Sequence, residues 1–161
     1  WVLVVVAGIT AIGIIGGFML KSRIEVTSTF SVNVDRIKVF EKLVDFESIP
    51  KWNSSVLSSK MLSNNSGVGS EFIEKRKELF STSDMKFRVL ESKPSEFLKV
   101  QGQSGQTTIQ FEFSVQELNH ETQVQLRFVE MPKPRILAAL LRPIYQRSVD
   151  ANMAKLKALM L

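Results

Sequence analysis

Residues 109–128 read IQFEFSVQELNHETQVQLRF, and apolar side chains occupy every second position on both sides of Asn119-His120-Glu121. The apolar positions are Ile109, Phe111, Phe113 and Val115, followed by Val124, Leu126 and Phe128. An alternation of period two predicts half-buried strands, and a short connection between two of them predicts an antiparallel hairpin. Each strand then has one apolar face that another part of the chain must cover.

Further strands are predicted on the N-terminal side of this hairpin. Their ranges are 24–32, 56–63, 70–79, 85–90 and 97–103. Turn-forming residues separate them, among them Asn64-Asn65-Ser66-Gly67 and Lys93-Pro94-Ser95. Strands joined by short connections pair as hairpins, so we expect an antiparallel sheet of about seven strands in an α+β domain.

Two segments have helical spacing instead. Asp35 can cap a short helix that runs through Ile37, Val39, Phe40, Leu43 and Val44, whose spacing is helical. The C-terminal segment repeats apolar residues at helical intervals from Leu137 to Met160, which predicts the long helix that covers the sheet. Pro143 predicts a kink in this helix or a helix start close to it.

Residues 1–20 lack any charged side chain, and Lys21 and Arg23 follow them directly. A helix of about 20 apolar residues spans a bilayer core, so we expect a transmembrane anchor and a single-pass membrane localisation, with the side of the domain undetermined. Residues 21–23 form a short linker to one domain over 24–161. A cleaved signal peptide is the alternative, but no small-x-small cleavage site precedes Lys21.

The net charge of +5 is concentrated in the C-terminal helix. Residues 132–161 contain six basic residues and one acidic residue, whereas the preceding charges cancel. A basic amphipathic helix allows a membrane-surface or protein-interaction module. We favour the simpler interpretation, a solvated outer face on a helix whose apolar side packs inward, because the core needs that apolar side in any case. The positive charge is confined to this one helix, without exposed aromatic residues interleaved among the basic ones, and we expect no nucleic-acid partner.

Catalytic motifs are scarce in this sequence. It has no cysteine and a single histidine, His120, in a predicted turn, so we expect no metal site and no cofactor. The run Glu71–Glu78 mixes both charge signs, and its simplest interpretation is a solvated strand face with cross-strand ion pairs. Strand parity, however, places Glu74 and Arg76 on the same side as Phe72, and these two are the weak catalytic candidates.

The order of one strand, two short helices, a run of antiparallel strands and a long closing helix resembles the START-like (SRPBCC) superfamily. This group includes polyketide cyclases/dehydrases and lipid-transfer domains. Local matches are residues 39–53, which end in Pro50-Lys51-Trp52-Asn53, the loop Gly67-Val68-Gly69-Ser70, residues 106–128, and residues 153–159. The resemblance covers about residues 24–160.

The resemblance implies a helix-grip fold, in which the sheet wraps the last helix around an apolar cavity. It implies a binding module for a lipid-like or other hydrophobic small molecule, with a polyketide cyclase/dehydratase-like enzyme as the alternative. The inward-facing residues expected to touch a ligand are Trp52, Phe72, Phe87, Phe111, Phe113, Phe128, Leu141, Ile144 and Tyr145.

Overall fold

The computed structural model describes residues 23–77, 81–105, 107–131 and 137–161. Its strands are β1 (Ile24–Val32), β2 (Val56–Met61), β3 (Glu71–Lys77), β4 (Thr82–Lys93), β5 (Phe97–Ser104), β6 (Thr107–Leu118) and β7 (Glu121–Met131). They form one seven-stranded sheet in the order β1-β7-β6-β5-β4-β3-β2, and every neighbouring pair is antiparallel. The predicted antiparallel sheet of about seven strands is confirmed.

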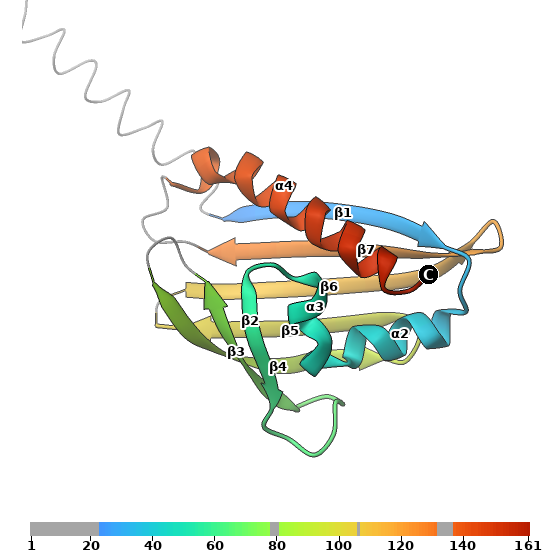
Figure 1. The fold of residues 1–161 in the computed structure, drawn as a ribbon, viewed down its shortest axis with the longest axis horizontal. Coiled ribbons are helices and arrows are strands. Elements are labelled where there is room, and N and C mark those ends of the chain that lie inside the picture. The colour runs from blue at the N-terminus through green and yellow to red at the C-terminus, as the bar shows by residue number, and fades with distance from the viewer. Residues whose placement is uncertain (1–22, 78–80, 106, 132–136) are drawn as a thin grey trace, which may run out of the picture.

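Four helical elements cover one face of this sheet (Figure 1). They are α2 (Arg36–Val44), the 3₁₀ helix η1 (Phe46–Ser48), α3 (Ile49–Trp52) and α4 (Leu137–Ala158). The predicted cap of α2 is present, because the Asp35 carboxylate accepts a hydrogen bond from the backbone N–H of Ile37 at 2.7 Å. Helix α4 begins at Leu137 and continues through Pro143, so the proline is not its start.

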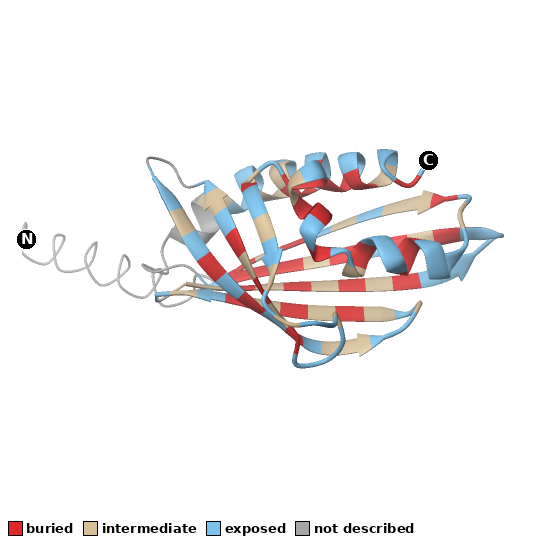
Figure 2. Ribbon diagram, turned by 60° about the horizontal axis from the view of Figure 1, so that its bottom comes forward, coloured by how far each residue is buried: buried red, intermediate tan, exposed pale blue. Residues whose placement is uncertain are grey.

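The strands bury alternate side chains on the face toward the helices, which we call the inner face (Figure 2). Helix α4 lies along β1 and buries Val149, Met153 and Leu156 between itself and the sheet. A curved antiparallel sheet closed by a C-terminal helix is the helix-grip arrangement that the resemblance implied.

The prediction of a single-pass membrane localisation is wrong: no helix within the described ranges is both long and apolar enough to cross a bilayer. Helix α4 has sufficient length at 22 residues, but charged side chains interrupt it at Arg142, Arg147, Asp150, Lys155 and Lys157. Residues 1–20, which we predicted as the anchor, lie outside the described residues, as do Lys21 and Ser22 of the predicted linker.

Candidate functional site

A small cavity lies between the inner face of the sheet and the short helices. It is lined by Leu43, Phe46, Ile49, Trp52, Asn53, Phe72, Glu74, Leu98, Val100, Phe111 and Phe113. The space open to the centre of a water-sized sphere is about 20 Å³, which is room for about one water molecule. This cavity is therefore smaller than the open apolar chamber that the resemblance implied. Side chains fill most of the space between the sheet and the short helices.

Aromatic rings account for much of that filling. Six of them form a continuous row from η1 across the sheet to α4, in the order Phe46, Phe72, Phe87, Phe111, Phe128, Tyr145. Neighbouring ring centroids are separated by 4.3, 5.0, 6.0, 5.2 and 5.6 Å in that order. Offset and tilted pairs at these distances attract one another beyond the effect of area burial. The row forms an apolar floor for the cavity region.

Gly102 on β5 makes room for this row. A Cβ atom at this position would lie 2.3 Å from the Phe87 ring, which is itself held between Phe72 and Phe111. We expect Gly102→Ala to lower the free energy of unfolding by about 1–3 kcal/mol through overpacking. Urea denaturation measures the loss. Gly105→Ala is the wrong control because its φ is +54°. A Cβ atom at Gly67 would meet only Asn65 Oδ1, at an ordinary contact distance of 4.0 Å, so Gly67→Ala should cost much less.

A buried ion pair joins the cavity wall to this aromatic floor. Glu74 is 2% exposed and lies 2.5 Å from the guanidinium Nη1 of Arg76, whose side chain is 12% exposed. Burial raises the pKa of Glu74, and the adjacent Arg76 charge opposes that rise. The guanidinium of Arg76 lies 5.9 Å from the centre of the Phe87 ring, a cation–π distance. The structure thus places the two predicted polar candidates together on the inner face, with Glu74 lining the cavity.

Glu130 on β7 is a second buried carboxylate near this pair, and sequence reasoning missed it. It is 8% exposed and accepts a hydrogen bond from the Tyr145 hydroxyl on α4. Burial raises the pKa of Glu130, while its bond to Tyr145 and the charge of Arg76 oppose the rise. The available signal was strand parity, since Glu130 continues the inward series of Leu126 and Phe128 by one step.

Three hydrogen-bonding atoms in this region lack a protein partner. Among the described side chains, the buried nitrogen and oxygen atoms without a partner are Trp52 Nε1, Ser59 Oγ and Ser83 Oγ. Ser59 is directly opposite Glu74 in the β2–β3 ladder, and Ser83 is directly opposite Arg76 in the β3–β4 ladder. Trp52 lines the cavity. Because buried polar groups are costly to leave unpaired, these three atoms are the part of the site with unused hydrogen-bonding capacity.

Hydrogen bonds from α4 hold the short helices over the cavity. Asn152 accepts from both the backbone N–H and the hydroxyl of Ser54 at 3.1 Å, and its amide donates to Asn53 Oδ1 at 3.2 Å. Both asparagines are buried. Asn53 was quoted for the resemblance alone, and nothing in the helical pattern indicated a polar residue at the inward position 152.

The ionised state of Glu130 should destabilise the folded chain. Its folded pKa is raised, so between the unfolded and folded pKa values the native state binds more protons, and stability falls as pH rises through that window. We expect Glu130→Gln to be more stable than the parent at pH 8 by on the order of 1 kcal/mol, with the difference vanishing near pH 4. Denaturant titrations at both pH values test this, and a difference independent of pH would contradict it.

The nine predicted ligand residues are placed as follows. Trp52, Phe72, Phe111 and Phe113 line the cavity, Phe87 and Phe128 belong to the aromatic row, and Leu141 and Tyr145 are half-buried against the core. Ile144 was wrongly expected to face inward, because it is 61% exposed. The inward positions of α4 are 141, 145, 149, 152, 153 and 156, and Ile144 lies about 100° around the helix from Tyr145.

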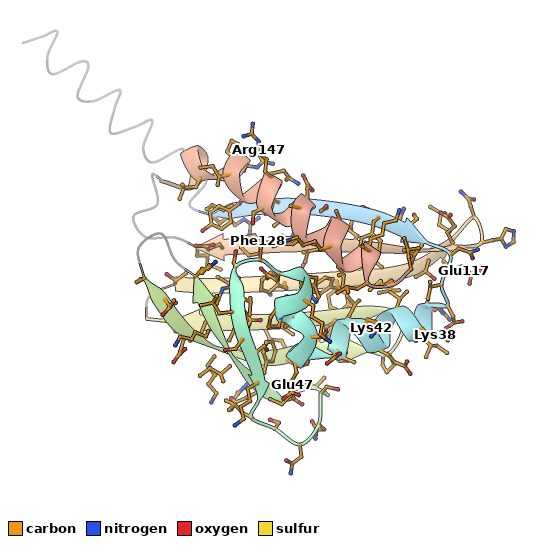
Figure 3. All side chains as sticks on the ribbon, viewed as in Figure 1. Lys38, Lys42, Glu47, Glu117, Phe128 and Arg147 are labelled. Atoms are coloured by element: carbon orange, nitrogen blue, oxygen red, sulfur yellow. The ribbon has the colours of Figure 1, made fainter. Side chains whose placement is uncertain are left out.

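The opposite faces of the same elements point to solvent. Glu71 on β3 is bonded to Lys86 at 2.6 Å and to Arg88 at 2.7 Å on the outer side of the sheet, as the cross-strand interpretation predicted. Figure 3 shows Phe128 beneath α4 and Arg147 on the side of α4 that faces away from the sheet. The mixed-charge run therefore divides by parity, with Glu71 outside and Glu74 and Arg76 inside.

Comparisons with known proteins identify the fold and the family. Residues 23–161 match the family described as polyketide cyclase / dehydrase and lipid transport, and the chain belongs to that family. Comparison with curated proteins gave no sequence match. The family and the fold neighbours support a hydrophobic-ligand-binding domain of the START-like superfamily, a group that includes polyketide cyclases.

Solved structures with the same fold cover nearly the whole domain. A START superfamily protein from Mycobacterium smegmatis has 16% identity and a TM-score of 0.72, over 84% of this chain and 96% of that chain. The Zhui aromatase/cyclase from a Streptomyces species has 13% identity and a TM-score of 0.70, over 84% and 92%. A protein from Thermus thermophilus has 16% identity and a TM-score of 0.67, over 83% and 94%. At these identities the likeness shows the fold alone.

Proposed function

We propose that this domain binds a lipid-like or other hydrophobic small molecule between the aromatic row and the short helices, with the polar end of the guest at Glu74 and Arg76. The observation that supports it most is the clustering of Trp52 Nε1, Ser59 Oγ and Ser83 Oγ, all buried and unpartnered, around that ion pair. An apolar site with a few convergent polar groups suits an amphipathic guest.

A lipid-like molecule is much larger than the cavity, so the cavity has to enlarge to admit it. The part of the cavity wall with the least stability of its own is the segment Phe46–Trp52. This segment consists of a three-residue η1 and a four-residue α3, and helices so short have little stability of their own. It provides Phe46, Ile49 and Trp52 to the cavity wall. Outward movement of this segment adds space without breaking the sheet, so we take it as the moving wall.

Binding of the neutral apolar fluorophore N-phenyl-1-naphthylamine tests the proposal with the full chain. We expect saturable fluorescence enhancement, weakened about tenfold in Val100→Phe, which narrows the cavity. Leu90→Phe is the matched control, because Leu90 is 40% exposed on the outer face and its variant should bind as the parent does. Thermal scans verify that both variants fold. Equal binding by the two variants, or no saturable binding by the parent, would contradict the proposal.

A polyketide cyclase/dehydratase-like reaction is the second candidate, and the observation that favours it is the position of Glu74. This carboxyl lines the cavity and is bonded to Arg76, and burial raises its pKa, which is the direction that a general acid requires. Dehydration of a β-hydroxyacyl thioester, followed by the ultraviolet absorbance of the conjugated product, tests it. Turnover that Glu74→Gln abolishes without changing fluorophore binding would support catalysis, and absence of turnover would reject it.

A further inference from the structure

The charges that face the interior are unbalanced toward the negative. Within the described ranges, the buried charged residues are Glu74 and Glu130, and the guanidinium paired with Glu74 belongs to Arg76. Glu130 has no ion pair of its own in that part of the chain. Both carboxylates belong to the inner face of the sheet, Glu74 on β3 and Glu130 on β7.

Arg76 is bonded to one of these carboxylates only. Its Nη1 lies 2.5 Å from Glu74 Oε2, whereas it forms no ion pair with Glu130 and acts on that residue through its charge alone. The hydrogen bond to Glu130 comes from the neutral Tyr145. An incoming carboxylate would therefore compete with Glu74 for the guanidinium and be repelled by Glu130. Such repulsion is strong in a site from which water is excluded, since the effective dielectric is low.

A hydroxyl group meets complementary partners in the same place. It can donate to an oxygen of Glu74 and accept from Trp52 Nε1 or from Ser59 Oγ, both of which are buried without a partner. A hydroxyl brings no charge that the site must neutralise, and it satisfies atoms that are otherwise costly to bury. The polar groups therefore match a neutral donor better than an anion.

Building on the proposed function, we infer that the site selects amphipathic molecules whose polar end donates a hydrogen bond and has no negative charge, so that it takes a long-chain alcohol in preference to a fatty-acid anion. The excess of interior carboxylates over guanidinium groups sets this preference. Glu130 is its main determinant, because Glu74 is already paired with Arg76.

Displacement of N-phenyl-1-naphthylamine from the full chain at pH 8 tests this inference, with 1-dodecanol and dodecanoate as competitors of equal chain length. We expect dodecanol to displace the fluorophore at a concentration at least tenfold lower than dodecanoate. Glu130→Gln removes one carboxylate, keeps an oxygen for the Tyr145 bond and should narrow the difference to below threefold. Glu117→Gln, at an exposed position on β6, should leave it unchanged.

The outcomes separate this inference from the proposed function. Fluorophore binding with equal displacement by both competitors, or stronger displacement by dodecanoate, overturns the charge preference and leaves hydrophobic binding intact. An unchanged preference in Glu130→Gln overturns the role of that residue. Absence of fluorophore binding overturns the proposed function and this inference with it. If Glu130→Gln fails to fold, the two competitors on the parent chain still decide the preference.

Discussion

Replacing Arg76 with methionine is expected to lower the free energy of unfolding by about 3–5 kcal/mol at pH 8, because it leaves the Glu74 carboxylate buried without its cation. Glu74 is 2% exposed, so water cannot take over the role of the guanidinium. The variant also loses the cation–π contact of Arg76 with Phe87, which is a smaller contribution. Urea denaturation followed by circular dichroism measures the loss.

The pH dependence of this loss distinguishes an unpaired charge from lost packing. Arg76 holds the pKa of Glu74 down, and without it the folded pKa rises further above the unfolded value. The folded variant then takes up a proton that the unfolded chain does not, so its stability falls as pH rises through the window between those values. We expect the loss to shrink as pH falls below the unfolded pKa of a glutamate, where Glu74 becomes neutral in both states.

The double variant Glu74→Met, Arg76→Met tests whether the loss of stability comes from the unpaired Glu74 charge. With both members of the pair replaced by apolar side chains of similar length, the penalty for an unpaired Glu74 carboxylate disappears and only the weaker effect of the Arg76 charge on Glu130 is lost. We therefore expect stability within about 1 kcal/mol of the parent. A matched surface pair is Glu71 and Arg88, because Arg88 is 62% exposed and its replacement should cost less than about 1 kcal/mol. A double variant as unstable as Arg76→Met would contradict the charge argument.

Strand periodicity predicted the sheet and the inner face, because a half-buried antiparallel strand must alternate. The same parity placed Glu74 and Arg76 inside with Phe72. It missed Glu130, because the predicted strand stopped at Phe128, one inward position before it. Prediction failed for Ile144, since helical spacing defines a face only to within about one residue, or 100°.

The periodicity of apolar residues in the sequence could not predict the size of the cavity. Alternation says which side chains point inward, but the space left between them depends on how closely Phe46–Trp52 approaches the sheet. That approach depends on the bonds of Asn152 to Asn53 and Ser54, which join residues about a hundred positions apart. Phe46 stacks on Phe72 with centroids 4.3 Å apart and so occupies the volume that the fold family suggested would be open.

Phe72→Ala is expected to lower the free energy of unfolding by about 3–5 kcal/mol and to open the cavity. Phe72 is 1% exposed, and its ring lies between Phe46 at 4.3 Å and Phe87 at 5.0 Å. Both neighbours lose a stacking partner, and the space added to the cavity is walled by apolar side chains. Urea denaturation measures the loss, with the half-buried Phe97 on β5 as the matched control.

Benzene distinguishes an opened cavity from a collapsed one in Phe72→Ala. An enlarged apolar cavity stays dry and admits a small aromatic guest, which stabilises the folded state by mass action. Saturating benzene should therefore raise the melting temperature of Phe72→Ala by several degrees while leaving the parent and Phe97→Ala unchanged. A stability loss without any benzene effect would mean that Phe46 and Phe87 close over the gap, and the moving segment Phe46–Trp52 would then be able to shrink the site as well as enlarge it.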